Sequence, residues 1–222
     1  MSVEGSFYQS ACLQINTARL DHLNRLQLPI EKKSVLEVGS GPGLLTSFFT
    51  EKGCKTLSLE GRKENVVTFK INNPNSEVMV FDCESSDWSS INKADICFCY
   101  GLLYHLSTPS EFLQNVSTKV KEFIIIETAI SNATSDNSIN IVDESNGDNA
   151  QALNGFGCRP TRKFLWDTLK SIYPYVYMPV VQPNHADFPK SYTNGGTQRM
   201  IVIGSKIPLN NNMLSDTFVE SY

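Results

Sequence analysis

The chain has 222 residues, of which 41% are hydrophobic and 19% charged, and its formal net charge is −4. These values indicate one globular domain with a core large enough to fold without disulfides. The acidic balance gives no broad basic surface for nucleic acid or anionic membranes, although a local basic patch can exist within it. No run approaches the roughly 18 apolar residues of a membrane helix, and residues 1–5 lack the features of a secretory signal. We therefore expect a cytoplasmic protein without a membrane segment.

The cysteine pattern argues against a metal site. Six cysteines are scattered along the chain without a Cys-x-x-Cys pair, and only three histidines accompany them. Zinc sites need closely spaced ligands of these types, so no metal is expected. Cys97 and Cys99 alternate around Phe98, and on a strand they would share one buried face as reduced thiols.

The first 130 residues alternate between predicted helices and strands. Apolar residues follow a roughly helical period over 7–28, and Pro29 ends this N-terminal helical segment, residues 1–30. Short apolar strands are then predicted at 34–38, 56–60, 78–81, 96–100 and 123–127, and helices at 44–51, 63–71 and 109–121. This alternation predicts an α/β fold, a Rossmann-like, doubly wound and mostly parallel sheet with helices on both sides.

The rest of the chain continues the same single domain, which we place at residues 31–206. Residues 132–149 are rich in Asn, Ser and Asp, and predict a surface loop or lid. A helix at 161–172 follows, and segments 176–181 and 200–204 are expected to form a closing, hairpin-like pair. Residues 207–222 have no core pattern and predict a mobile tail.

A glycine-rich loop follows the first predicted strand. The segment from Val35 to Gly43 reads Val-Leu-Glu-Val-Gly-Ser-Gly-Pro-Gly and places three glycines before a predicted helix. Glycine allows a sharp turn and a close approach of the backbone to a ligand, at the sheet edge where ligands bind in such folds. A simple strand-to-helix turn is the alternative. The spacing is neither the dinucleotide fingerprint, because Leu44 stands where its third glycine belongs, nor a phosphate loop, because no lysine follows.

With its E-x-G-x-G-x-G pattern, the segment resembles the class I S-adenosylmethionine-dependent methyltransferases, over roughly residues 33 to 130. The resemblance implies that the chain is a methyltransferase that binds S-adenosylmethionine as its cofactor through Gly39, Ser40, Gly41 and Gly43. It also places Glu37 near the methionine end, where it orders the loop or its waters.

Two acidic strand ends fit the same family. Glu60, followed by Gly61, ends the second strand 21 residues after Gly39, close to the spacing at which an acidic side chain binds ribose hydroxyls; alone, it would be a solvated strand end. Asp82 and Cys83 follow the third strand and resemble the adenine-binding position of the family. The alternative for Asp82 is a turn or helix cap.

After the fourth strand stands a Gly-x-x-Tyr-His-Leu run, from Tyr100 and Gly101 to Leu106. It resembles one subset of the family, which includes wobble-uridine-modifying tRNA enzymes and several small-molecule methyltransferases. The resemblance places this loop beside the reactive methyl group. It implies that Tyr100 and Gly101 bind the cofactor and that Tyr104 and His105 are the candidate catalytic residues. A base such as His105 matters only if the acceptor must lose a proton; otherwise the histidine is structural.

The acceptor side has weaker signals. Arg159 and Arg162 stand at the start of a predicted helix, where cations and free amides suit a carboxylate, a phosphate or a nucleotide-sugar group. An ordinary solvated helix start explains them equally well. His185, within Pro-Asn-His-Ala-Asp-Phe, is a candidate for the rim of an acceptor pocket or part of an ordinary turn.

Two classes of function remain. The first is methyl transfer to an oxygen or nitrogen of a small-molecule or carbohydrate-like (glycan-like) acceptor, with a tRNA acceptor as a minor variant because the chain is acidic and has no added RNA-binding domain. The second is a non-catalytic S-adenosylmethionine-binding or assembly module. The intact Glu37, glycine loop, Glu60 and Asp82 favour catalysis. The sequence does not define the oligomeric state.

Overall fold

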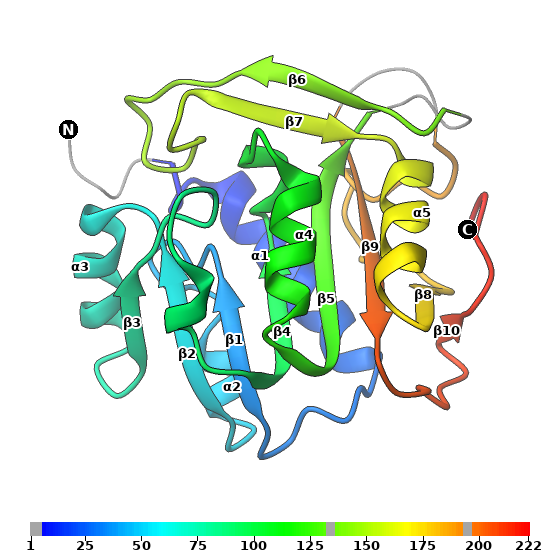
Figure 1. Ribbon diagram of the computed structural model, residues 1–222, viewed down its shortest axis with the longest axis horizontal. Coiled ribbons are helices and arrows are strands. Elements are labelled where there is room, and N and C mark those ends of the chain that lie inside the picture. Colours follow the sequence, from blue (N-terminus) through cyan, green and yellow to red (C-terminus); the bar gives the residue numbers. More distant parts are fainter. Residues whose placement is uncertain (1–5, 132–135, 193–196) are drawn as a thin grey trace.

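The computed structural model describes residues 6–131, 136–192 and 197–222, and its centre is an eight-stranded sheet in the order β3-β2-β1-β4-β5-β9-β8-β10 (Figure 1). The strands are β1 (Ser34–Val38), β2 (Lys55–Glu60), β3 (Glu77–Val80), β4 (Ala94–Tyr100), β5 (Val120–Ile130), β6 (Ile139–Asp143), β7 (Phe156–Pro160), β8 (Tyr175–Pro179), β9 (Gln198–Ser205) and β10 (Leu214–Ser215). The helices are α1 (Ser10–Arg25), α2 (Ser47–Thr50), α3 (Lys63–Asn72), α4 (Pro109–Ser117) and α5 (Arg162–Ile172), with short 3-10 turns η1 (Trp88–Ser90) and η2 (Leu103–His105).

The first five strands of the sheet are parallel, which confirms the predicted Rossmann-like class. Leu36 of β1 lies opposite Leu57 of β2 on one side and Cys97 of β4 on the other. Strand β9 then runs antiparallel to β5, and β8 runs antiparallel to β9, as expected for the closing pair. Because β5 is central and covered on both faces, its sequence is an almost unbroken apolar run.

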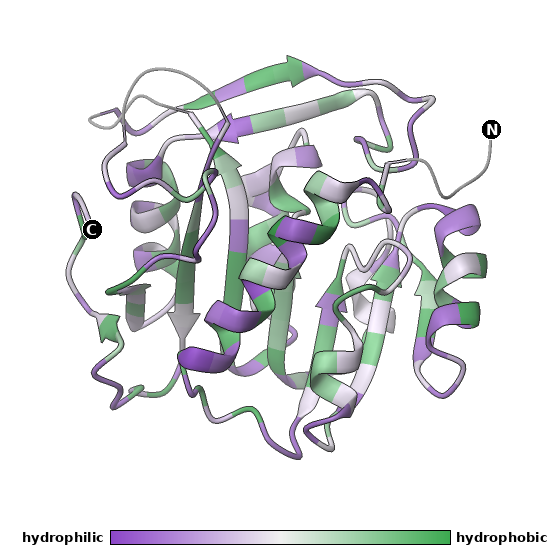
Figure 2. Ribbon diagram, turned by 180° about the vertical axis from the view of Figure 1, so that it is seen from behind, coloured by the Kyte–Doolittle hydropathy of each residue, from purple (hydrophilic) through white to green (hydrophobic). Residues whose placement is uncertain are grey.

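Two apolar cores lie on the two faces of the sheet. On one face, β-strand residues such as Leu36 and Ile124 pack beneath α4 and α5, which contribute Phe112 and Leu165. On the other face, Ile125 and its neighbours pack beneath α1 and α2. Figure 2 shows α1 lying across this second face, over strands coloured mainly as hydrophobic. Cys97 and Cys99 are buried free thiols on the first face, as the alternation predicts.

The segment predicted as a surface loop or lid, 132–149, is not a loop throughout. Residues 132–135 lie outside the described residues, but 139–143 form β6, which pairs antiparallel with β7. The two strands lie across the upper edge of the sheet in Figure 1, beyond the carboxyl ends of the parallel strands. The polar composition did not predict strand β6, because a hairpin with one side open to solvent needs few large apolar residues.

The C-terminal residues 207–222, predicted to be mobile, pack against the domain. Strand β10 pairs with β8, and Leu209 is buried. Near the end of the chain, Phe218 packs edge-on against Trp166 of α5. These contacts come from single apolar residues without a period, which explains why the sequence pattern did not show them.

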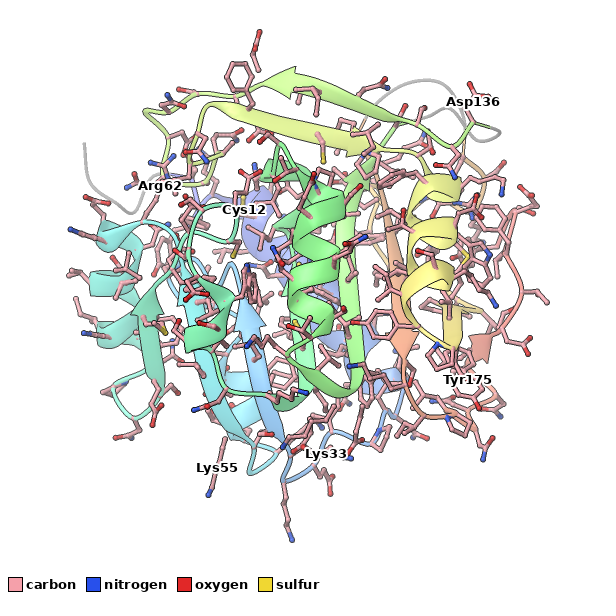
Figure 3. All side chains as sticks on the ribbon, viewed as in Figure 1. Cys12, Lys33, Lys55, Arg62, Asp136 and Tyr175 are labelled. Carbon is pink, nitrogen blue, oxygen red and sulfur yellow. The ribbon has the colours of Figure 1, made fainter. Side chains whose placement is uncertain are left out.

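The two ends of the sheet differ in character. Figure 3 shows Lys33 and Lys55 projecting outward from the lower end, whereas Arg62 and Cys12 lie at the upper end below β6 and β7. Loops that follow β1, β2 and β4 gather at this upper end. Within the described part of the chain, no helix combines the length and the apolarity that crossing a membrane requires.

Candidate active site

The glycine loop after β1 is a tight turn that only glycine permits. Gly39, Gly41 and Gly43 have φ angles of +73°, +53° and +78°, in the left-handed region that side chains disfavour. A Cβ on Gly39 would lie 2.7 Å from the Cβ of Leu102. The loop closes on itself through the Gly43 amide, which donates to the Ser40 carbonyl at 3.0 Å. The glycines of this loop are therefore required by its backbone conformation and, at Gly39, by the close approach of Leu102 in the loop after β4.

Glu60 joins this loop to the end of β2. Its carboxylate accepts hydrogen bonds from the amides of Gly41 at 2.8 Å and Arg62 at 2.9 Å, and from the side chain of Asn65 at 3.1 Å. Burial raises the pKa of Glu60, although these three hydrogen bonds oppose the rise. The carboxylate is thus fixed at the mouth of the loop by donors from two elements.

Glu37 lies beneath the loop rather than in an open site. Its buried carboxylate accepts hydrogen bonds from the hydroxyls of Thr46 and Ser58, each at 2.7 Å. Burial raises the pKa of Glu37 to about 7, despite the opposing hydrogen bonds from Ser58 and Thr46. Because Thr46 directly precedes α2, Glu37 ties β1 and β2 to the far end of the glycine loop.

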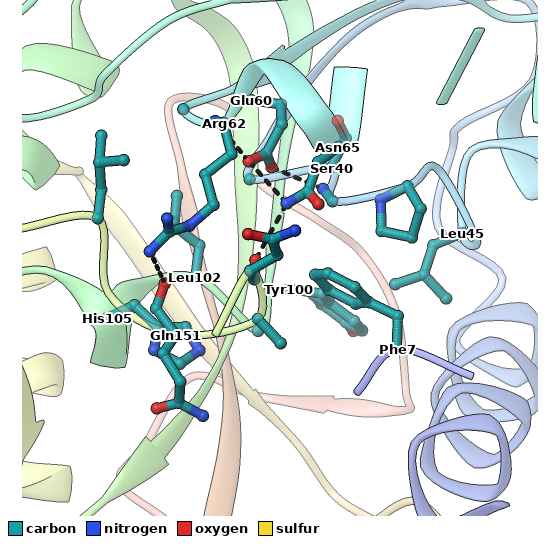
Figure 4. Close-up of a pocket in the computed structure, with 18 of the residues that line it drawn as sticks. Phe7, Ser40, Leu45, Glu60, Arg62, Asn65, Tyr100, Leu102, His105 and Gln151 are labelled. Carbon is teal, nitrogen blue, oxygen red and sulfur yellow. Dashed lines mark hydrogen bonds between the residues drawn. The ribbon is translucent and has the colours of Figure 1, made fainter. Parts of the chain in front are cut away.

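A cleft, called the first cleft below, opens between the glycine loop, the ends of β2–β4, α1 and the segment 149–153. It collects most of the residues predicted to bind a cofactor or to act in catalysis. Those that line it are Gly39, Ser40, Gly41, Glu60, Gly61, Asp82, Cys83, Tyr100, Gly101, Tyr104 and His105. Figure 4 shows Glu60, Ser40 and Asn65 together at one end, and His105 with Gln151 at another. Gly43 and Glu37 do not line the cleft; the Gly43 backbone faces Phe69 instead.

A second cleft adjoins the first. It is lined by residues of the β6–β7 hairpin, the end of β5, the start of β9 and the beginning of α1, among them Ser131, Asn140, Val142, Arg159 and Gln198. The two clefts share the lining residues Cys12, Tyr104, Ala150, Gln151 and Arg199. The structure thus has two adjoining clefts, of which the second is the more polar, and Tyr104 is one of the five residues that line both.

A protein-family model described as "Methyltransferase domain" matches residues 13–165, which include the glycine loop, Glu60, the loop after β4 and the β6–β7 hairpin. The chain belongs to this methyltransferase family. It is an S-adenosylmethionine-dependent enzyme, and the predicted family, activity and cofactor are confirmed.

Solved structures share the fold of this methyltransferase. The N-terminal domain of EvdMO1, in the presence of SAH and D-fucose, has 21% identity and a TM-score of 0.70 over 86% of this chain and 83% of that one. The DhpI–SAH complex has 13% identity and a TM-score of 0.60, over 90% and 89%. The 1,6-didemethyltoxoflavin-N1-methyltransferase of Burkholderia thailandensis has 15% identity and a TM-score of 0.57, over 92% and 82%. No curated protein matches the chain.

In the methyltransferase, Asp82 builds a turn, which is the alternative given from sequence, and this turn lies at the wall of the first cleft. It lines the first cleft, and its carboxylate also accepts hydrogen bonds from the Glu84 amide at 3.0 Å and the Ser85 hydroxyl at 2.5 Å. The residue therefore builds the turn after β3. The buried neighbour Cys83 lines the same cleft.

A buried charge cluster at the junction of the clefts was not predicted. Glu127 of β5 is fully buried and pairs with Arg19 of α1 at 2.6 Å and with Arg199 of β9 at 3.1 Å. Arg199 also donates to the hydroxyl of Tyr104 at 3.2 Å. The Tyr100 hydroxyl is buried nearby without a partner among the described residues. A lone arginine in each of two distant segments gives no sequence signal of this convergence.

Three residues predicted to bind the acceptor have different positions. Arg159 lines the second cleft and pairs with Glu144 at 3.3 Å. Arg162 does not line either cleft: it is buried, and its guanidinium donates to the carbonyls of Val219 and Glu220, so its predicted role was wrong. His185 also lies outside both clefts, where its Nδ1 accepts from the Asp187 amide at 3.2 Å, as in the ordinary-turn alternative.

Proposed function

We propose that the enzyme transfers the methyl group of S-adenosylmethionine to an oxygen or nitrogen of a small, polar, carbohydrate-like acceptor. In this proposal the first cleft holds the cofactor and the second cleft holds the acceptor. The observation that carries it is the junction of the two clefts at Tyr104, beside His105. A methyl donor and its acceptor must meet at one point, and two adjoining clefts that share lining residues support such a meeting here.

The residues of the first cleft fit the cofactor. Glu60 would accept hydrogen bonds from the ribose hydroxyls, and the turn at Asp82 and Cys83 would bind adenine. The backbone at Gly39 and Gly101 would lie along the methionine part. Two buried hydroxyls of this cleft, on Ser40 and Tyr100, have no partner among the described residues. Buried polar groups are normally hydrogen-bonded, so these two hydroxyls support a polar ligand at this place.

The second cleft fits an acceptor that carries several hydroxyl groups. Ser131, Asn140, Arg159 and Gln198 give it both donors and acceptors, whereas Ala129 and Val142 supply apolar contacts. Sugar rings present the same mixture of hydroxyls and apolar C–H faces. That the N-terminal domain of EvdMO1 was crystallised in the presence of D-fucose supports a sugar-like acceptor here. The 1,6-didemethyltoxoflavin bound by another structural neighbour supports small acceptors in general.

Methyl transfer requires mainly that the protein position the acceptor atom. When bound, the sulfonium of the cofactor supplies an activated methyl group with a good leaving group. The protein contributes by holding the acceptor atom in line with that methyl group and by excluding water, effects that reach several kcal/mol in well-oriented reactions. The buried cluster of Arg19, Glu127 and Arg199 fixes Tyr104 at the junction, which restricts where an acceptor can lie.

A product assay tests this function. S-adenosylhomocysteine release is measured with D-fucose, other free sugars and nucleotide-linked sugars, after calorimetry has shown cofactor binding. We expect turnover with at least one of these acceptors. Cofactor binding without turnover of any of them would contradict the acceptor assignment, and no binding would contradict the cofactor site.

Two residue-level changes separate the clefts. Glu60→Ala removes the proposed ribose acceptor, and one lost charge-assisted hydrogen bond costs about 1.5–3 kcal/mol, so cofactor affinity should fall tenfold or more.

Asn140→Trp should fill the second cleft and raise the KM for the acceptor with unchanged affinity for S-adenosylhomocysteine. Ile141→Trp is its control, because Ile141 is 54% exposed and lines neither cleft. Equal effects of the two tryptophans would place the acceptor elsewhere.

A further inference from the structure

Glu144, which follows β6, connects the hairpin to the loop that carries His105. Its carboxylate contacts Nδ1 of His105, accepts a hydrogen bond from the Ala152 amide at 2.8 Å, and pairs with Arg159 at 3.3 Å. Only 3% of the Glu144 side chain and 13% of the His105 side chain are exposed. A buried carboxylate with three partners is held in one orientation, and it holds the imidazole in turn.

The contact between Glu144 and Nδ1 of His105 determines which ring nitrogen of the histidine can accept a proton. Burial raises the pKa of Glu144, but the hydrogen bond and charge of His105, the Ala152 amide and Arg159 outweigh it, so the pKa is lowered. Glu144 is therefore ionised near neutral pH and only accepts hydrogen bonds. Nδ1 of a neutral His105 must then carry the hydrogen, and Nε2 keeps its lone pair. No described residue bonds to Nε2.

The position of the imidazole suits a base. His105 lines the first cleft, and its ring centroid lies 3.9 Å from that of Tyr104, the residue at the junction with the second cleft. The segment that carries Glu144 is anchored from the other end of the first cleft, because Arg62 donates to the Ala152 carbonyl at 3.0 Å and Asn65 to the Asn149 carbonyl at 3.0 Å. His105 thus lines the first cleft beside Tyr104, which lines both clefts, and Glu144 contacts the imidazole without lining either cleft.

We propose that Glu144 is a positioning residue that holds His105 as a general base, and that the acceptor atom is a hydroxyl oxygen. The inference rests on the proposed function, since it needs an acceptor at the junction of the clefts. A free amine attacks with its own lone pair, whereas a neutral hydroxyl becomes a good nucleophile only as its proton leaves. A carboxylate-oriented histidine is the arrangement that removes such a proton.

The proposed step balances without any further reactant. The acceptor oxygen forms the new bond to the methyl carbon as the carbon–sulfur bond breaks and its electron pair stays on sulfur. The hydroxyl proton passes to Nε2 of His105, and the resulting imidazolium is stabilised by the Glu144 carboxylate. Solvent removes the proton after the products leave. Other ionisable groups beside the pair are Tyr104, Arg159, Arg199, Cys158 and Glu84. Glu84 accepts hydrogen bonds from the amides of Ser107 and Thr108, shortly after His105.

One experiment needs no acceptor. The chain has three histidines, so ¹⁵N-histidine NMR of the complex with S-adenosylhomocysteine gives a spectrum that His105→Ala assigns directly. We expect the Nδ1-protonated tautomer of His105 in the wild type and the loss of this preference in Glu144→Gln. An Nε2-protonated His105 in the wild type would overturn the proposal, whatever the outcome of the product assay.

A second experiment uses the acceptor found in the product assay. Glu144→Gln keeps the shape of the side chain, and its turnover should fall by roughly 10–100-fold with unchanged cofactor affinity, within the range of general-base effects. The acidic limb of its pH–rate profile should also move. Ser145→Ala is the control, because Ser145 is exposed and, among the described residues, its hydroxyl accepts a hydrogen bond only from the Gly147 amide of the same turn. Unchanged turnover and an unchanged profile in Glu144→Gln would show a merely structural anchor and overturn the proposal.

Discussion

The two clefts are built in different ways. The glycine-loop end of the first cleft takes its shape from neighbours along the chain: the glycine loop follows β1, Glu60 ends β2, and the donors that hold Glu60 lie within 19 residues of it. The second cleft is assembled from the beginning of α1, the end of β5, the β6–β7 hairpin and the start of β9. A site built from local backbone geometry tolerates little change but is visible in sequence. A site built from distant side chains is visible only in the fold.

The largest effect is expected where backbone geometry alone matters. Gly39→Ala places a Cβ 2.7 Å from that of Leu102 at a φ of +73°. The backbone strain of about 1–3 kcal/mol and the displaced leucine should together lower the affinity for S-adenosylhomocysteine by roughly 100-fold or more, at about 1.4 kcal/mol per tenfold. Calorimetry measures this directly.

Gly53→Ala is the matched control for that variant. Gly53 also has a φ of +70°, but the nearest atom to its added Cβ is a lysine side-chain carbon at 3.5 Å, and it lies outside both clefts. It should lower stability while leaving the affinity unchanged. An equal loss of affinity in both variants would mean that strain acts through the whole domain and not through the loop.

The next effect concerns the distant contacts that support the second half of the domain. Arg162→Ala removes hydrogen bonds to Val219 and Glu220 and the stacking of the guanidinium 3.9 Å from the Tyr192 ring. Hydrogen bonds of a charged group contribute about 1.5–3 kcal/mol each, so the free energy of unfolding should fall by about 3 kcal/mol. Denaturant unfolding and proteolysis of the C-terminus measure the loss.

The neighbouring Lys163→Ala is the control. Lys163 pairs with Asp167 one turn along the exposed side of α5 at 2.8 Å, and such a pair contributes about 0.5 kcal/mol or less. A similar stability for the two variants would show that the C-terminal residues do not depend on Arg162.

A further effect, which depends on pH, is expected beneath the glycine loop. Burial raises the pKa of Glu37 from 4.5 to about 7, so the folded protein holds a proton over this interval that the unfolded chain releases. The contribution of Glu37 to stability is therefore complete below pH 4.5 and is lost as pH rises towards 7. Glu37→Gln keeps an acceptor for Thr46 and Ser58 but cannot titrate. It should be more stable than the wild type above pH 7, by on the order of 3 kcal/mol.

Urea unfolding of both proteins from pH 4.5 to 8 tests this sign. The difference in unfolding free energy should grow up to about pH 7 and then level off. A constant difference over that interval would show that Glu37 is ionised throughout and would weaken the link between its burial and the loop.

The sequence predicted the features that depend on neighbouring residues, but not those that depend on contacts between distant residues. The strand–loop–helix order, the glycine loop and the strand-end position of Glu60 were readable because period and backbone conformation are local properties. Arg162 was mistaken for an acceptor ligand, since a cation at a helix start looks the same whether it faces solvent, a ligand or distant carbonyls. Glu144 gave no signal at all. It lies in a polar segment, and its partner His105 is 39 residues away along the chain.

The Glu127 cluster has a consequence for the order in which the protein forms. Its two arginines lie 108 residues before it and 72 residues after it. A nascent chain leaving the ribosome has made β1 to β5 and the whole glycine loop before Arg199 exists. Until β9 arrives, one edge of β5 is unpaired and Glu127 has a single cation beside it. The junction of the clefts therefore closes only after β9 has been made, later than the glycine loop and the strands beside it.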